Sequence, residues 1–427
     1  MPLSTIRPLL AGSLLALVAC SSPSEDAPSA TAAKSGGSAT APTPAQEALE
    51  GPARPALLLT QAWFWKDEAG KSRPGPARLE IWRESDRGWE ATRLEDGDSN
   101  VFHKAIAFDG GILTIGAERA LLKKWTHRDG SWSSETLWER EWGGRFNRLR
   151  DMEIGDVDGD GHDEIVVATH DAGVVAVIDL EGGKPKVAEF DEKADTFVHE
   201  IEIGDIDGDG KLEFFATPSD RNKADASQAG GIVMYRFNGT TYERSWIEEQ
   251  HGTHAKEILA HDMDGDGKSE LFGVLEAQID PNNKTRLLKP VEIRQYFVAA
   301  DGSITHKTVA TIEDRLTRFL VPADFDGDGH AELVAATFRT GLHHVRPPAE
   351  PGGDWTIKLF DRNSSGFEHA AYATDLDQDG SPELYVAADD QGKLRRYVYG
   401  TGGVFRKTEL GVLDKSVLTW NITTGTF

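Results

Sequence analysis

The chain has 427 residues, 39% of them hydrophobic, so it is long enough to bury a large core. Its 46 basic and 71 acidic residues give a formal charge of −25, which disfavours any function that rests on bulk attraction to nucleic acid or anionic lipid. A single cysteine excludes a disulfide framework and any cysteine-based zinc or iron–sulfur site.

The N-terminal residues form a candidate processing signal. Arg7 precedes an apolar stretch from Leu9 to Ala19, far shorter than the roughly 20 residues that span a bilayer. The tetrapeptide that ends at Cys20 resembles the lipobox of bacterial lipoproteins, which implies cleavage before Cys20 and attachment of a diacylglycerol to its sulfur. Because Ser21 stands where an aspartate would favour the inner membrane, we expect a lipid anchor at the outer membrane of the cell envelope. An ordinary secretory signal with a chance cysteine is the alternative.

Residues 20–52 are rich in Ser, Ala, Pro, Thr and Gly and lack periodicity, which predicts a flexible linker that spans roughly 30 Å. Apolar runs at Leu57–Trp65, Leu79–Arg83 and Trp89–Leu94 then predict three strands. The segment Val101–Ile115 predicts two more strands, joined by the tight hairpin signal Asp-Gly-Gly that begins at Asp109.

An acidic nine-residue motif then recurs five times, at intervals of 49 to 62 residues. Each copy follows a short apolar run and precedes a second one, so each is predicted to be a loop between two strands. The five copies are Asp156–Glu164, Asp205–Glu213, Asp262–Glu270, Asp324–Glu332 and Asp375–Glu383.

The spacing within each loop predicts a cation site. Carboxylates at positions 1, 3, 5 and 9 can converge on one hard cation, with the backbone carbonyl of position 7 completing the shell and a glycine at position 6 allowing the sharp turn. An all-oxygen donor set selects Ca²⁺ over zinc or copper. The rival EF-hand needs a glutamate at position 12 and flanking helices. Position 12 is instead Val167, Ala216, Gly273, Ala335 and Val386.

We therefore expect about five Ca²⁺ ions, each with five ligand residues. The residue at position 7 of each motif is expected to bind through its backbone carbonyl. The predicted ligands are Asp156, Asp158, Asp160, His162, Glu164; Asp205, Asp207, Asp209, Lys211, Glu213; Asp262, Asp264, Asp266, Lys268, Glu270; Asp324, Asp326, Asp328, His330, Glu332; and Asp375, Asp377, Asp379, Ser381, Glu383.

These loops resemble the FG-GAP, or VCBS, repeat of integrin-α-like β-propellers, and the resemblance covers residues 146–390. It implies an all-β fold whose blades have four antiparallel strands, A innermost to D outermost, with the metal loop between A and B. The fifth copy departs from the pattern at Gln378, where the others have glycine.

Counting blades on this basis predicts a seven-bladed propeller over residues 53–427, with six blades as the alternative. One blade is composite, with three strands from residues 57–100 and one from 417–427, which would close the ring and leave no open edge. The remaining blades are a calcium-free blade at 101–145 and calcium blades at 146–196, 197–252, 253–316, 317–366 and 367–416.

A basic residue lies six positions before each acidic loop, and the calcium-free blade has one at the matching offset from its hairpin. In a propeller these residues would form a ring on the face opposite calcium, either as a cationic mouth for an acidic ligand or as a repeated packing position. They are His103, Arg150, His199, Lys256, Arg318 and His369.

These common catalytic motifs are missing: the sequence contains no Gly-x-Ser-x-Gly and no His-Glu-x-x-His. We expect a calcium-stabilised, membrane-tethered recognition module that binds a glycan or an envelope or extracellular protein and no nucleic acid. Because related calcium-rich propellers include polysaccharide lyases, a carbohydrate-active enzyme is the first alternative. A structural subunit of an envelope assembly is the second.

Overall fold

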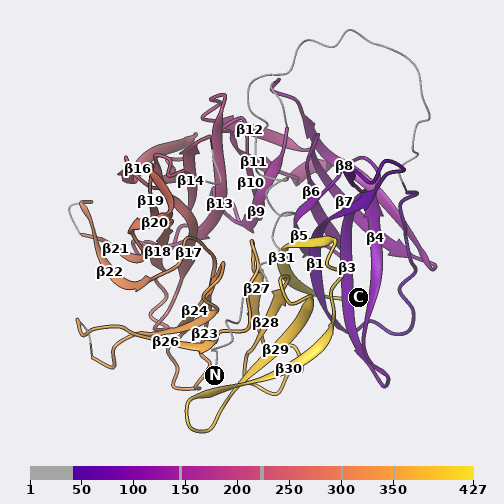
Figure 1. Cartoon of the computed structure of the whole chain (residues 1–427). Coiled ribbons are helices and arrows are strands. Elements are labelled where there is room, and N and C mark those ends of the chain that lie inside the picture. Colours follow the sequence, from indigo (N-terminus) through magenta and orange to yellow (C-terminus); the bar gives the residue numbers. More distant parts are fainter. Residues whose placement is uncertain (1–41, 144–146, 222–225, 300–301, 351) are drawn as a thin grey trace, which may run out of the picture.

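The computed structural model describes residues 42–143, 147–221, 226–299, 302–350 and 352–427. The regular elements of the described residues are β-strands and one 3₁₀ turn, η1 (Glu181–Gly183), and no described helix has the length and apolarity to cross a membrane. Seven antiparallel sheets, six of four strands and one of five, surround a central axis, and two further strands pair as a separate hairpin (Figure 1). The predicted seven-bladed β-propeller is confirmed, and Cys20 lies outside the described residues.

Blade 1 draws its strands from both ends of the chain. From the axis outward it contains β31 (Val417–Thr426), β1 (Pro55–Lys66), β3 (Ala77–Ser85) and β4 (Gly88–Asp96), and β2 (Ser72–Pro74) pairs with the end of β1. The pairing between β1 and β31 runs from Pro55 opposite Thr426 to Trp63 opposite Val417. The last strand of the chain is therefore held along nearly the whole length of the first.

The other six blades are continuous in sequence, and each begins with its innermost strand. Blade 2 contains β5 (Phe102–Phe108), β6 (Gly111–Gly116), β7 (Ala120–Arg128) and β8 (Ser131–Arg140). Blade 3 contains β9 (Leu149–Gly155), β10 (Glu164–Thr169), β11 (Val175–Asp179) and β12 (Lys186–Phe190). Blade 4 contains β13 (Thr196–Gly204), β14 (Glu213–Asp220), β15 (Gly230–Phe237) and β16 (Tyr242–Gln250).

Blade 5 carries an additional hairpin between its second and third strands. It contains β17 (Ala255–His261), β18 (Glu270–Leu275), β21 (Val291–Val298) and β22 (Ile304–Ile312), and the hairpin is β19 (Gln278–Asp280) with β20 (Asn283–Lys289). Blade 6 contains β23 (Thr317–Ala323), β24 (Glu332–Thr337), β25 (Leu342–Arg346) and β26 (Thr356–Asp361). Blade 7 contains β27 (Ala371–Thr374), β28 (Glu383–Ala388), β29 (Lys393–Gly400) and β30 (Val404–Val412).

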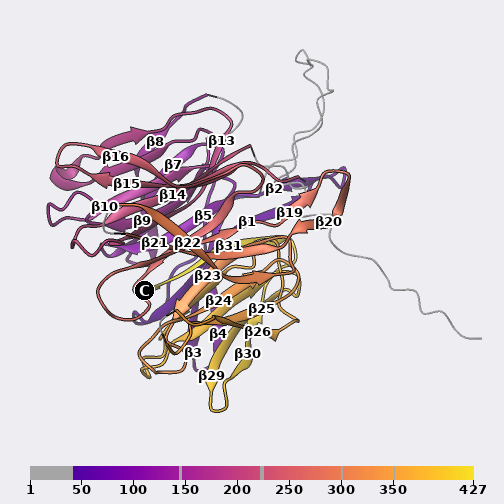
Figure 2. The ribbon, with the colours of Figure 1, turned by 90° about the vertical axis from the view of Figure 1, so that its left-hand side faces the viewer.

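The innermost strands contact one another in turn around the axis, from β31 to β5, β9, β13, β17, β23, β27 and back to β31. Seen from the side, the blades stack face to face (Figure 2). Each pair of neighbouring blades encloses its own apolar cluster, so the core consists of seven inter-blade layers.

Strand periodicity explains these layers, because successive side chains of a strand point to opposite faces of its sheet. In β1, Ala56 and Leu58 enter the cluster shared with blade 2, whereas Leu57 and Leu59 enter the cluster shared with blade 7. The central strands are buried on both faces, and therefore read as continuous apolar runs rather than as alternating ones.

Two local features bear on the sequence predictions. The predicted hairpin of blade 2 is present, because Asp109 and Gly110 both adopt positive φ angles, 43° and 67°, between β5 and β6. The end of the predicted linker, in contrast, lies against blade 1. Gln46 forms a β-bridge with Leu94, and the Glu47 carbonyl accepts a hydrogen bond from Trp132 Nε1. These residues cover the outer edge of β4, which would otherwise present unpaired backbone groups.

Candidate metal centre

The five acidic loops all join the first and second strands of blades 3 to 7, so they lie at one end of the ring. The first aspartate organises each loop through backbone hydrogen bonds. Asp156 Oδ1 accepts from Gly159 N at 2.8 Å and Asp156 Oδ2 accepts from Gly161 N at 3.0 Å. Glu164 Oε2 accepts from Val157 N at 3.0 Å, which ties the end of the loop to its beginning.

The carboxylates at positions 1, 3 and 9 converge in every loop, with one oxygen of each within 4.8 Å of the others. These groups are Asp156, Asp158, Glu164; Asp205, Asp207, Glu213; Asp262, Asp264, Glu270; Asp324, Asp326, Glu332; and Asp375, Asp377, Glu383. The position-5 aspartate lies outside each group. Asp160 Oδ1, for example, accepts a hydrogen bond from His162 N at 2.9 Å. Coordination by positions 5 and 7 stays a prediction.

The electrostatics of these groups favour a bound cation. Burial and the nearby carboxylate of Asp158 raise the pKa of Glu164 to about 7. Burial and the neighbouring Asp326 likewise raise the pKa of Glu332 to about 7. An all-carboxylate donor set whose glutamates have a raised pKa fits a hard divalent cation such as Ca²⁺.

The backbone of the loops explains their glycines. Gly159 and Gly161 adopt φ angles of 76° and 94°, in the left-handed region that glycine enters without strain. In the fifth loop Gln378 replaces the first of these glycines and adopts the same conformation, with a φ of 61°. The departure at this position therefore keeps the loop geometry, at a backbone cost of roughly 1–2 kcal/mol.

Comparison with known families gives a match at the loops themselves. Residues 156–216, which include the first two acidic loops, match the family model described as FG-GAP-like repeat. The chain carries an FG-GAP-like repeat. The three later loops have the same carboxylate spacing and the same place between the first two strands of a blade, so we describe all five as FG-GAP-like loops.

Solved structures with the same fold are distant in sequence, and no curated protein matches the chain. A protein from Lactobacillus plantarum has a TM-score of 0.53 at 11% identity, covering 89% of this chain and 99% of its own. A "putative 6-phosphogluconolactonase" from Bacteroides fragilis has a TM-score of 0.52 at 14% identity, with 87% and 98% covered. A functionally unknown protein from Desulfotomaculum acetoxidans gives 0.52 at 13% identity, with 86% and 98% covered. These likenesses concern the fold alone.

The predicted basic ring lies at the end of the inner strands opposite the FG-GAP-like loops, and its side chains are buried. The strand pairings explain this position. In blades 2, 3, 5 and 6 the register of the two inner strands skips the basic residue, which is the extra residue of a β-bulge. In blade 4 the shift spans His199, and in blade 7 His369 adopts a positive φ of 55° just before β27.

Hydrogen bonds hold the ring residues within the protein. His103 Nδ1 donates to Leu149 O at 2.6 Å, and His369 Nδ1 donates to Thr337 O at 2.7 Å, both across a blade boundary. Lys256 Nζ donates to His199 Nδ1 at 2.8 Å. Burial lowers the pKa of His369 to about 4 and that of His199 well below its usual value, so both imidazoles are neutral at pH 7.

An ion-pair bridge crosses the axis at this end. Arg150 Nη2 of blade 3 lies 3.5 Å from Glu368, and Arg318 Nη2 of blade 6 lies 3.9 Å from the same carboxylate. Glu368 precedes β27 of blade 7, so three blades meet at one buried carboxylate. This arrangement favours the packing interpretation of the ring, and a role in ligand binding stays a prediction.

The seventh member of the ring escaped the sequence reasoning because it is not basic. The register between β1 and β31 skips Trp420, which places this residue at the bulge of blade 1. The Trp420 ring lies 4.7 Å from that of His103 and 5.0 Å from the guanidinium of Arg150. A search for the bulge rather than for charge would have found it.

We predict that Trp420→Ala lowers the free energy of unfolding by about 3–5 kcal/mol, because it empties a buried site where blade 1 meets blades 2 and 3. Urea unfolding measured by tryptophan fluorescence and circular dichroism provides the test. The matched control is Trp246→Ala, since Trp246 is 42% exposed and should cost less than about 1 kcal/mol. Equal losses in the two variants would contradict a special role for the bulge residue.

Proposed function

We propose that this protein is a calcium-stabilised propeller of the bacterial cell envelope, tethered by a lipid on Cys20, that recognises a glycan or a protein partner. The five clustered carboxylate groups of the FG-GAP-like loops carry the calcium part of the proposal. The residues at positions 1, 3 and 9 would hold each ion, and the ion would neutralise like charges at the junction of two core strands.

The size of the calcium effect follows from mass action. Each site that binds only in the native state stabilises it by RT ln(1 + [Ca²⁺]/Kd), about 2.7 kcal/mol at a hundredfold excess over Kd. Five independent sites would therefore contribute as much as the whole stability of a typical domain, ~5–15 kcal/mol. Calcium would thus set whether the recognition face is rigid.

We expect Glu164→Gln to remove one bound ion, because glutamine lacks the charge but keeps the acceptor for Val157 N. In chelator this variant should be at least as stable as the wild type at pH 7.5. The raised pKa of Glu164 means that its stability contribution is present below its ordinary pKa of 4.5 and is lost as the pH rises to about 7. Asp156→Ala should instead lose stability with and without calcium, since Asp156 also holds the loop backbone.

Elemental analysis and thermal unfolding, each with calcium and with chelator, test this pair of variants. The calcium proposal fails if wild-type protein prepared in calcium contains none, or if chelator leaves its melting temperature unchanged.

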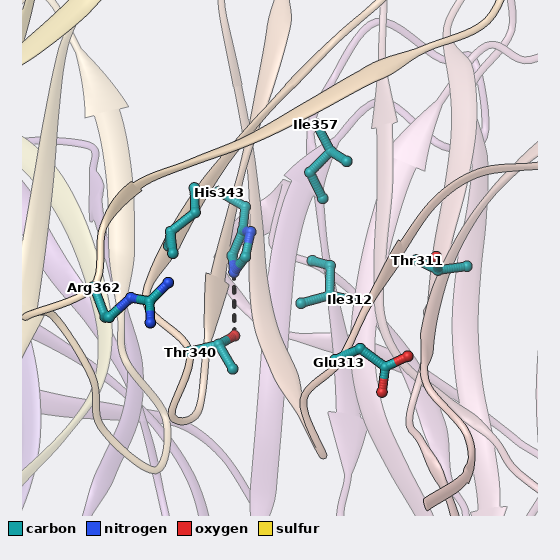
Figure 3. A pocket seen from close by; sticks show the side chains of 8 residues that line it. Thr311, Ile312, Glu313, Thr340, His343, Ile357 and Arg362 are labelled. Carbon is teal, nitrogen blue, oxygen red and sulfur yellow. Dashed lines mark hydrogen bonds between the residues drawn. The ribbon is translucent and has the colours of Figure 1, made fainter.

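The face opposite the FG-GAP-like loops is the proposed recognition surface, because loops on a rigid scaffold are where binding usually occurs. The β19–β20 hairpin extends from this face and exposes Leu288. A pocket of about 320 Å³ lies nearby, between blades 5 and 6 (Figure 3). Arg362 and His343 line one side, Glu313 lies opposite, and Ile312 and Ile357 add apolar surface.

This pocket has the size and mixture of groups expected for a small ligand or for one sugar unit of a glycan. The His343 Nε2 and Thr340 Oγ1 atoms lie 3.1 Å apart, so the imidazole is oriented on the pocket wall. The exposed guanidinium of Arg362 is free to meet a carboxylate or hydroxyl of a ligand.

We predict that the calcium-loaded protein binds at least one glycan on an array that includes polyuronates, and that Arg362→Ala weakens this binding about tenfold. The reason is the loss of a charge-assisted hydrogen bond in the pocket. Arg87→Ala, which removes an exposed arginine on blade 1, is the matched control. Unchanged binding in the Arg362 variant would exclude this pocket. New ultraviolet-absorbing chain ends on a polyuronate would identify a lyase instead of a recognition module.

The anchor has its own test. Cys20→Ser should leave an unlipidated protein that alkaline extraction releases from membranes, because no thiol remains for the diacylglycerol. Labelling with a radioactive fatty acid measures the same change directly. A variant that stays membrane-bound and is processed normally would contradict the anchor.

A further inference from the structure

The third strand of each blade places one residue over the acidic loop, and its identity differs between blades. The strand register shows that these positions are equivalent. The first residue after the loop pairs with the residue just before the position on the third strand. These pairs are Phe214 with Tyr235 in blade 4 and Leu333 with Val345 in blade 6. That next position is Arg236 in blade 4 and Arg346 in blade 6. By the same register it is Asp179 in blade 3 and Phe297 in blade 5.

The two arginines reach into the carboxylate groups of their loops. Arg236 Nη2 lies 2.5 Å from Asp207 Oδ2, and Arg236 Nε lies 2.8 Å from Glu213 Oε1. Arg346 contacts both of its carboxylates through Nη2, which pairs with Asp326 Oδ2 and lies 3.2 Å from Glu332 Oε1. Each guanidinium therefore bridges positions 3 and 9, two of the three carboxylates that would hold the ion.

The loops of blades 3 and 5 have no such internal cation: within the described part of the chain, no lysine or arginine pairs with their converging carboxylates. In blade 3, Asp179 is itself bonded to Lys186, at 2.8 Å. In blade 5, Phe297 is 44% exposed and bears no charge. In blade 7 the register places Val398 at the equivalent position, and Arg396, two residues earlier, lies 3.5 Å from Asp377 but makes no ion pair with Glu383 among the described residues.

We infer that Arg236 and Arg346 are internal cations that compete with calcium, so that the five sites load in order. This inference rests on the calcium binding proposed above and concerns how those same sites are regulated. A divalent ion at the second or fourth loop has to displace a guanidinium that bridges two carboxylates, whereas an ion at the first or third loop displaces no side-chain cation. The loops of blades 3 and 5 therefore bind calcium first and those of blades 4 and 6 later.

The same arginines stabilise their loops when calcium is scarce. A guanidinium between two carboxylates relieves the repulsion that the empty loops of blades 3 and 5 retain. Blades 4 and 6 would stay ordered without metal, and blades 3 and 5 would be the calcium-dependent parts. The displaced Arg346 also has room, because it borders a depression of about 670 Å³ that Asp324 and Tyr399 share.

Calcium affinities measured by chelator competition on the full chain, with ions per chain counted by native mass spectrometry, test the order of loading. We expect the wild type to show at least two affinity classes. Arg236→Gln should move one ion from the weaker class to the tighter one, by about threefold or more, the scale of a partly exposed arginine–carboxylate pair. It should also lower the melting temperature in chelator.

Two further variants make the test specific. Phe297→Arg places an arginine at the equivalent position of blade 5, and should weaken one tight site about threefold, whereas Phe297→Gln should not. Arg294→Gln is the matched control on the same strand, because Arg294 pairs with Glu248 and Glu292, outside the loops.

Five equal affinities, or no change in affinity for Arg236→Gln, would overturn the inference and leave calcium binding intact. Absence of any calcium from the wild type would overturn both. Two affinity classes that respond to Arg236→Gln and to Phe297→Arg in opposite directions would support the inference.

Discussion

The pairing of the first strand with the last is the interaction on which the rest of the structure depends. Every apolar layer lies between two blades, so no blade has a core of its own. If β31 left β1, the layer between blades 7 and 1 would open, and the inner strands would lose their ring of neighbours. Closure also covers the edge of β1, at which an open blade 1 would pair with other chains.

The sequence predicts the fold well because its strongest signals are local. The carboxylate spacing marks the turn between the first two strands of five blades, and Asp109 with Gly110 marks the equivalent turn of a sixth. Three strands at one end and one strand at the other then complete a seventh blade. The convergence of positions 1, 3 and 9 follows from the same spacing, since the three carboxylates belong to one short loop.

Features that depend on contacts between residues distant in sequence could not be predicted from local sequence patterns. The basic ring is recognisable as a repeat, but its burial follows from β-bulges and from Glu368, which brings Arg150 and Arg318 together across the axis. The cover of β4 by Gln46 is hidden in a stretch with linker composition. Arg236 lies 23 residues from Glu213, and only the register of two strands shows that they meet.

The composite blade also has a consequence for the order of events as the protein is made. Strands β1, β3 and β4 precede the other blades in sequence, yet their inner partner β31 follows all of them. Blade 1 therefore keeps one edge open until β31 has reached β1. The loop to be closed is nearly the whole domain, and long-range pairing of this kind is slow and exposed to aggregation. A chain that stops before β31 would hold six complete blades and no ring.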